Sequence, residues 1–226
     1  MYYRLNGLVL RTNIVGEADK SAVVYTREWG KIQAIVPGAK KIKAKLNAAT
    51  EPVIESDFMV YMAGPTARPK VTGVKIIDEF APLKTDWRRF SMALSCAEIT
   101  ELLTPYHAEN EQKYDLLSRT WKLMEKAKHP WRICTAFTLR FLRLSGYSYL
   151  EYIKRETSSV TTEEYNIIKQ FSVLSGADVD NGMEISDKME KRIDSHLEKY
   201  LSQHISRPLM TKIFLNKVQT NSTLVP

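Results

Sequence analysis

The sequence is poor in the residues that build metal and disulfide sites. Only two of its 226 residues are cysteine, Cys96 and Cys134, and four are histidine. No C-x-x-C, H-E-x-x-H or E-x-x-H pattern occurs, so a zinc ribbon or a di-iron bundle would have no ligands. His196 and His204 are too far apart for a helical ligand pair, and we interpret both as partly exposed surface residues. We therefore predict no metal ion and no cofactor, and both cysteines lie in apolar helical patterns that indicate buried core positions.

Glycine is also sparse, and its spacing excludes the common nucleotide and nucleophile motifs. The nine glycines are never two or four residues apart, so neither G-x-G-x-x-G nor G-x-S-x-G occurs. The P-loop pattern G-x-x-x-x-G-K-[ST] is missing as well. Glu98 and Glu101 share a helical face, but no partner motif accompanies them, and we interpret them as solvated side chains. The sequence therefore predicts a binding protein rather than an enzyme, with no catalytic residue.

Long apolar runs are missing too. The longest are a few residues, such as residues 7–10, well short of the roughly 20 that cross a bilayer. Residues 1–6 lack the apolar core of a secretory signal. A hydrophobic content of 44% is nevertheless enough for a folded core. We expect no membrane association and a cytoplasmic location.

Positive charge is abundant and concentrated near the start of the chain. Residues 1–84 carry 13 Lys and Arg against 8 Asp and Glu, whereas residues 85–226 carry 20 against 18. The fifteen residues 31–45 contain no acid and include five lysines: Lys31, Lys40, Lys41, Lys43 and Lys45. Such a cluster is found on solvated loops as well as on polyanion-binding surfaces. Its two alanines and one isoleucine make a poor apolar stripe for a membrane surface.

The first eighty residues have the pattern of a small β-barrel. Five segments rich in Val, Ile and Tyr are bounded by turn residues: 2–11, 21–27, 31–36, 52–62 and 69–77. Five such strands are typical of an OB-fold barrel, which commonly binds oligonucleotides, although an SH3-like barrel has a similar pattern. Aromatic side chains for base stacking are available, and most should lie in the core. Trp29, beside a turn, is the candidate for an exposed platform.

After Pro82 the apolar period changes from two to 3.6, which indicates helices. We predict two domains, an OB-fold barrel over residues 1–83 and an all-α domain over residues 84–226, and hence an α+β multidomain fold. Helix starts are indicated at Asp86, Pro130, Thr161 and Ser186. The expected helices are 87–103 with an apolar stripe on one side, 109–126, one from Pro130 ending at Gly146, a shorter one from Thr161, a longer one from Ser186, and 209–218. Residues 175–181 are expected to form a loop and residues 219–226 a frayed tail.

One basic feature lies in the predicted helix that begins at Pro130. Arg132, Arg140 and Arg143 fall within a narrow arc of the helix. Surface arginines beside a core helix are usually solvated. A cationic pocket edged by Phe137, Phe141 and Leu144 could instead receive an acidic peptide with an apolar end.

Two groups of residues resemble the bacterial RecO family of recombination mediators. Near the amino end, these are residues 6–12, the run 16–20, the strand-and-turn 23–31 and the segment 35–41. Near the carboxyl end, residues 197–201, 204–209 and 214–215 resemble the family's closing motif. The motifs stand at the two ends of a chain of fitting length, around the barrel-then-helices plan predicted above.

The resemblance implies a protein that binds single- and double-stranded DNA, anneals complementary strands and works near the nucleoid. It also implies partnership with RecR, with the acidic carboxyl-terminal tail of single-strand-binding protein and, indirectly, with RecA. By position, Lys40 and Lys41 match the family's basic pair, while Arg11, Arg27 and Lys31 match its strand motifs. Together with Lys43 and Lys45, these are the predicted DNA contacts.

The chain departs from the family in one respect. Many members carry a four-cysteine zinc module after the third long helix, whereas residues 146–182 contain no cysteine here. We expect a salt-bridged or apolar mini-core in its place. Two other functions remain open from the sequence: an OB-fold RNA-binding or ribosome-associated protein, and a protein adaptor whose lysines only solubilise it.

Overall fold

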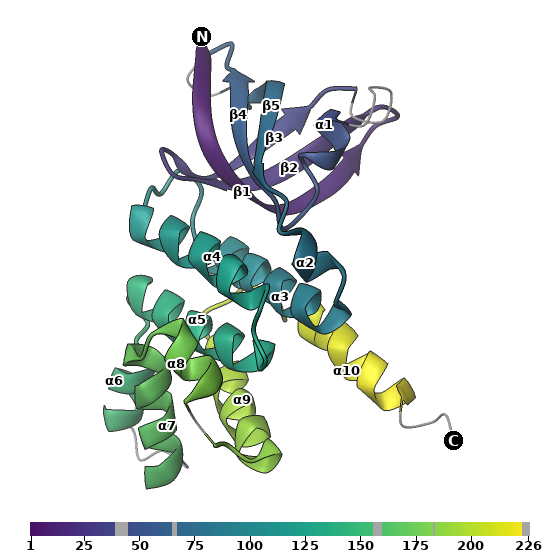
Figure 1. Cartoon of the computed structure of the whole chain (residues 1–226). Helices are drawn as coiled ribbons and strands as arrows, with labels where there is room; N and C mark the ends of the chain where they lie inside the picture. Colours follow the sequence, from purple (N-terminus) through teal and green to yellow (C-terminus); the bar gives the residue numbers. More distant parts are fainter. Residues whose placement is uncertain (39–44, 65–66, 156–159, 183, 223–226) are drawn as a thin grey trace.

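The computed structural model describes residues 1–38, 45–64, 67–155, 160–182 and 184–222. It shows a five-stranded barrel followed by a helical part (Figure 1). The strands are β1 (Tyr2–Val15), β2 (Asp19–Thr26), β3 (Gly30–Val36), β4 (Glu55–Tyr61) and β5 (Lys70–Asp78). Among the described residues, no helix is long and apolar enough to cross a membrane. The predicted five strands and the α+β fold class are confirmed.

The strands close into a barrel in the order β1-β2-β3-β5-β4. Four pairings are antiparallel, and a short parallel pairing of β3 with β5, at Ile35 and Lys70, closes the ring. Successive side chains of a strand point to opposite faces, so every second residue points inward. These inward side chains form the barrel core: Leu5, Val9, Ala22, Val24, Ile32, Ala34, Val36, Ile54, Phe58, Val60 and Val71. The barrel therefore presents the alternate residues of β1, β4 and β5 outward.

The helices are α1 (Lys45–Ala48), α2 (Ala81–Lys84), α3 (Trp87–Leu103), α4 (Glu111–Met124), α5 (Pro130–Leu144), α6 (Tyr149–Arg155), α7 (Thr162–Val173), α8 (Gly176–Asn181), α9 (Asp187–Leu201) and α10 (Met210–Ser222). Several predicted helix starts are confirmed by their side-chain caps. Asp86 accepts from the N–H groups of Arg88 and Arg89, and Ser186 accepts from that of Met189. Thr161 forms a reciprocal capping box with Glu164.

Two expectations about the helices are wrong. Residues 175–181 were expected to form a loop, but the Ser175 hydroxyl accepts from the N–H of Asp178 and starts α8, which buries Val179. Helix α10 also continues to Ser222, beyond the predicted end at residue 218. In α8, the cap and the burial of Val179 stabilise a helix that the local pattern leaves too short.

The predicted one-sided apolar stripe of α3 is also wrong. Trp87 at its start is exposed, whereas Ala93, Cys96, Ala97 and Ile99 are all buried. Helix α3 lies against β1, α4, α5 and α10 at once, so it is covered on most of its circumference. Cys96 and Cys134 are buried free thiols with their Sγ atoms 3.8 Å apart, as the sequence predicted.

The barrel and the helices share one core. Leu8, Leu10, Val23 and Tyr25 of the barrel belong to the same buried cluster as the helical side chains. The Tyr25 hydroxyl donates to the carbonyl oxygen of Asn110, and burial raises the pKa of Tyr25 to about 12. The base of the barrel is therefore packed against the helices, while the amino terminus lies at its far end (Figure 1).

Candidate nucleic-acid interface

The predicted lysine cluster is only partly within the described residues. Lys40, Lys41 and Lys43 lie outside them, and Lys45 is the first residue of α1. Their predicted contact with DNA stays a prediction.

Arg11 and Lys31 lie at the junction of barrel and helices. Arg11 donates through Nε and Nη2 to both carboxylate oxygens of Glu101, at 2.8–3.0 Å, and this raises the pKa of Arg11. Lys31 is only 7% exposed, and its Nζ donates to the backbone oxygen of Glu101 at 2.6 Å. The same ammonium group lies 4.4 Å from the ring centre of Tyr106, and burial lowers the pKa of Lys31. Both side chains therefore join β1 and β3 to α3.

Arg27 makes a third contact across the junction. Its guanidinium donates to Glu111 and, at 2.6 Å, to Asp115, both on α4. It also lies 4.5 Å from the ring centre of Tyr114. A guanidinium held by two carboxylates is less available to a phosphate than a free one. The structure thus gives Arg11, Arg27 and Lys31 a structural role, and a DNA contact by these three stays a prediction.

Glu98 and Glu101 are not the solvated pair that the sequence suggested. Glu101 is held by Arg11, as described above, and Glu98 is only 8% exposed. The carboxylate of Glu98 accepts from Arg207, from the N–H groups of Met210 and Thr211 and from the Thr211 hydroxyl. Both carboxylates bind partners that lie far along the chain.

The barrel has one open surface that combines aromatic and cationic side chains. We call it the outer β1–β4–β5 face. Its members share an outward position on three adjacent strands: Tyr2, Arg4, Met59, Tyr61, Lys70 and Lys75. The strand register arranges them in rows, with Tyr2 opposite Tyr61 and Tyr61 opposite Lys70. In the next row, Arg4 is opposite Met59, and Met59 is opposite Gly73, which has no side chain.

The two tyrosines of this face form an exposed aromatic pair. Tyr2 is 67% and Tyr61 is 36% exposed, and their ring centres are 5.2 Å apart. Trp29, the platform that the sequence favoured, is half-buried and packs edge-on against Tyr3 at 4.8 Å. The signal for the tyrosine pair was present in the alternation of β1 and β4, which places both rings on the outward side.

The charge of the outer face is positive. Arg4 donates to Asp57, which lowers the pKa of Asp57. Lys70 and Lys75 are exposed and form no ion pair with any described residue, and Arg68 is exposed just before β5. Three cationic side chains without an ion-pair partner among the described residues, Arg68, Lys70 and Lys75, thus lie on or next to a face that carries two exposed rings, an arrangement suited to phosphates and unpaired bases.

The three arginines predicted for a partner site do not share one surface, because Arg132 does not line the groove that contains Arg140 and Arg143. Arg132 is 5% exposed and its Nε donates to Glu190 at 3.1 Å. Arg140 donates to the carbonyl oxygens of Phe171 and Leu174 at the end of α7. Of the three, only Arg143 is exposed. The correction follows from packing, since α7 and α8 lie against α5 and Glu190 of α9 pairs with Arg132.

Two members of the predicted apolar edge of that pocket are wrong, because Phe137 and Phe141 are fully buried, whereas Leu144 lines a groove beside Arg140 and Arg143. Arg140 and Arg143 instead line a shallow groove between α4 and α5, together with Arg119, Leu116 and Leu123.

Residues 146–182, where we expected a mini-core in place of the family's zinc module, contain an apolar cluster. Its buried members are Tyr149, Ile153, Ile168, Phe171 and Val179. Among the described residues no group of three or more metal-ligating side chains is found.

Comparison with known proteins identifies the family. The family model for the amino-terminal part of recombination protein O matches residues 1–80, and the model for its carboxyl-terminal part matches residues 84–149. The chain belongs to the RecO family. The two models together cover more than half of the sequence and part close to the predicted domain boundary at residue 83.

Individual RecO proteins are similar over the same region. The DNA repair protein RecO of Heliobacterium modesticaldum is 37% identical over 145 residues, which is 64% of this chain and 52% of that protein. That of Alkaliphilus metalliredigens is 34% identical over 147 residues, 65% of this chain and 59% of that protein. The match thus spans about half to three fifths of these RecO proteins. The RecO of Thermoanaerobacter sp. aligns over 96% of this chain and 98% of its own length, at 19% identity.

Proposed function

We propose that this chain is a DNA-binding mediator of recombination and DNA repair that catalyses no reaction itself. The observation that carries the proposal is the outer β1–β4–β5 face, where an exposed tyrosine pair lies beside lysines with no ion-pair partner among the described residues. Membership of the RecO family supports it, since the similar proteins are named DNA repair proteins.

A single strand fits this face better than a duplex. Its unpaired bases can stack on Tyr2 and Tyr61, a contact worth about 1–3 kcal/mol per base. Its phosphates can approach Lys70 and Lys75, and the release of counterions makes that part of the binding dependent on salt. A duplex keeps its bases paired and offers only phosphates to the same lysines.

Annealing follows from the same chemistry. Two complementary strands repel each other through their phosphates, and a protein that neutralises some of these charges lowers that repulsion. The outer face supplies Arg4, Arg68, Lys70 and Lys75, and the predicted lysine cluster would add further charge. We therefore propose that the protein binds single- and double-stranded DNA and accelerates pairing without hydrolysing ATP.

The proposed partners come from the family. We propose that the chain acts with RecR, binds the acidic tail of single-strand-binding protein and thereby assists the loading of RecA. The groove between α4 and α5 is the site that we propose for the acidic tail, because Arg119 and Arg143 are exposed beside Leu116 and Leu123.

Fluorescence anisotropy with a labelled thymidine oligonucleotide, at several salt concentrations, tests DNA binding by the outer face. The double variant Lys70→Glu, Lys75→Glu should bind more weakly, and the slope of log affinity against log salt should flatten by about 0.7 for each phosphate that the two side chains no longer neutralise. Lys169→Glu, a charge reversal at an exposed position of α7, should leave both quantities unchanged. Equal binding by the double variant and the native protein would exclude this face as the site.

A further inference from the structure

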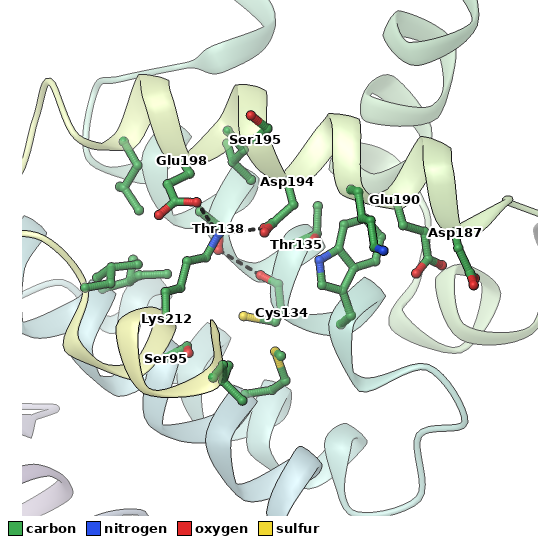
Figure 2. A pocket seen from close by; sticks show the side chains of 18 residues that line it. Ser95, Cys134, Thr135, Thr138, Asp187, Glu190, Asp194, Ser195, Glu198 and Lys212 are labelled. Carbon is green, nitrogen blue, oxygen red and sulfur yellow. Dashed lines mark hydrogen bonds and ion pairs between the residues drawn. The ribbon is translucent and has the colours of Figure 1, made fainter. Parts of the chain in front are cut away.

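A cavity of the helical part lies between α3, α5, α9 and α10 and has a volume of about 520 Å³ (Figure 2). Its inner wall is apolar. The side chains that form this wall come from all four helices and the turn before α10: Met92, Ile99, Trp131, Cys134, Leu197, Leu201, Leu209 and Leu215. The volume is sufficient for one or two large apolar side chains of a ligand.

A buried threonine whose hydroxyl has no described partner lies in this wall. Thr135 is 3% exposed and lines the cavity, yet its hydroxyl forms no hydrogen bond with any described residue. Its neighbour Thr138 is satisfied, because its hydroxyl donates to the carbonyl oxygen of Cys134 at 2.8 Å. The hydroxyl oxygen itself keeps access to the open cavity, so it is available to a guest.

The rim of the cavity is acidic. Asp187, Glu190, Asp194 and Glu198 recur along one face of α9, above the apolar wall (Figure 2). Lys191 and Lys212 are the only cations in the described lining, and Arg132 pairs with Glu190 from outside it, so four carboxylates are opposed by three cationic groups. An apolar cavity with this rim repels an acidic peptide and attracts a basic one.

Lys212 shows how the rim receives a cation. Its ammonium group, from α10, lies 2.6 Å from Asp194 and 3.7 Å from Glu198. Glu190, inside the acidic row, accepts a hydrogen bond from Arg132. The carboxylates at the two ends of the row, Asp187 and Glu198, are therefore less well neutralised than the two between them. Asp187 forms no ion pair with any described residue, and the side chain of Glu198 is 51% exposed.

The spacing of these two ends sets the length of the guest. Asp187 and Glu198 are separated by eleven positions of α9, or about 16 Å at 1.5 Å per residue. An extended peptide covers that distance in about five residue steps.

We propose that this cavity binds a short cationic peptide segment, with basic residues about five positions apart that meet Asp187 and Glu198. An apolar side chain between them fills the cavity, and the peptide backbone satisfies the Thr135 hydroxyl. The site is separate from the outer β1–β4–β5 face and takes a ligand of opposite charge.

The test uses the whole chain and a fluorescein-labelled hexapeptide of sequence Lys-Leu-Phe-Gly-Leu-Lys with blocked ends. Two further peptides serve as controls, one with both lysines changed to glutamate and one with the apolar residues changed to serine. Fluorescence anisotropy should show saturable binding of the first peptide alone. Equal binding of the glutamate or the serine peptide would overturn the proposal, as would no binding of the first.

Variants locate the site. Asp187→Lys with Glu198→Lys should weaken binding of the first peptide at least tenfold, while Glu17→Lys with Glu163→Lys, the same charge change at exposed positions elsewhere, should alter it little beyond the effect of net charge. Thr135→Val keeps the shape of the side chain and removes the hydroxyl, and it should weaken binding at least threefold. Circular dichroism should show that all variants are folded. If the first double variant and its control bind alike, the rim is not the site.

Discussion

The buried carboxylate of Glu98 fixes the start of α10, and we expect its replacement by glutamine to loosen that helix. Four hydrogen bonds converge on this carboxylate, from Arg207, Met210 and Thr211. Burial alone would raise the pKa of Glu98, but the backbone N–H groups of Thr211 and Met210 and the side chains of Arg207 and Thr211 outweigh burial, so the net pKa is lowered. The carboxylate thus caps a helix from a distance.

The expected cost follows from the hydrogen bonds that glutamine cannot accept. One oxygen of Glu98 is replaced by an amide NH₂, which faces an N–H donor and leaves it unsatisfied at about 1–3 kcal/mol. The missing charge partner of the partly exposed Arg207 adds about 0–1 kcal/mol. We expect Glu98→Gln to destabilise the protein by about 1–4 kcal/mol, which lowers the melting temperature of a chain of this size by about 2–16 °C.

Thermal unfolding followed by circular dichroism measures this change. Glu163→Gln, at an exposed position of α7, is the matched control and should shift the melting temperature by less than about 2 °C. Amide hydrogen exchange adds a local measurement, because the N–H groups of Met210 and Thr211 should lose protection first. A melting temperature within about 1 °C of the native value, with unchanged exchange at these amides, would refute the reasoning.

Three further changes test other contacts. Gly30→Ala should destabilise the protein by about 3 kcal/mol or more in urea unfolding, because Gly30 has φ +64° and a Cβ there would overlap the carbonyl of Ala108. Gly16→Ala is the control: Gly16 has the same φ but open space around it, so this change should cost only about 1–2 kcal/mol. Equal costs for the two variants would contradict the packing argument. Thr135→Val should change the free energy of unfolding by less than about 1 kcal/mol, because the hydroxyl faces the open cavity and has no hydrogen bond to a described residue to lose, and a larger loss of stability would show that the hydroxyl has a partner. Because the pKa of Glu98 is lowered in the folded state, its contribution to stability is fully present above the ordinary carboxyl range and is lost as the pH falls through the folded-state value. The free energy of unfolding should therefore decline below about pH 4.5, and Glu98→Gln should flatten part of that decline. An identical pH dependence in the variant would contradict this prediction.

The helix starts could be predicted because their signals are local. Asp86, Thr161 and Ser186 each cap an N–H group two or three residues away. The strands were found for the same reason, since alternation and turn residues lie within each segment. Helix α8 was missed because six residues carry too short a pattern to outweigh the glycine and the polar residues around it.

The roles of the charged side chains could not be predicted from local sequence. Arg27 and Asp115 are 88 positions apart, and Arg11 and Glu101 are 90 positions apart. Nothing near either arginine indicates that a helix from the second half of the chain will supply its partner. Because Arg11 and Arg27 match the family's strand motifs, the sequence suggested that they contact DNA. The structure shows instead that they join the barrel to the helices.

A double variant of the tyrosine pair tests most directly whether single-stranded DNA binds to the outer β1–β4–β5 face. The double variant Tyr2→Ala, Tyr61→Ala keeps every charge and removes only the exposed rings. We predict that it binds a labelled single-stranded oligonucleotide at least about 30-fold more weakly than the native protein, because two base contacts of about 1–3 kcal/mol each are lost, with duplex affinity and the salt dependence little changed. Unchanged single-strand affinity in this variant would contradict the account and show that DNA binds on another surface.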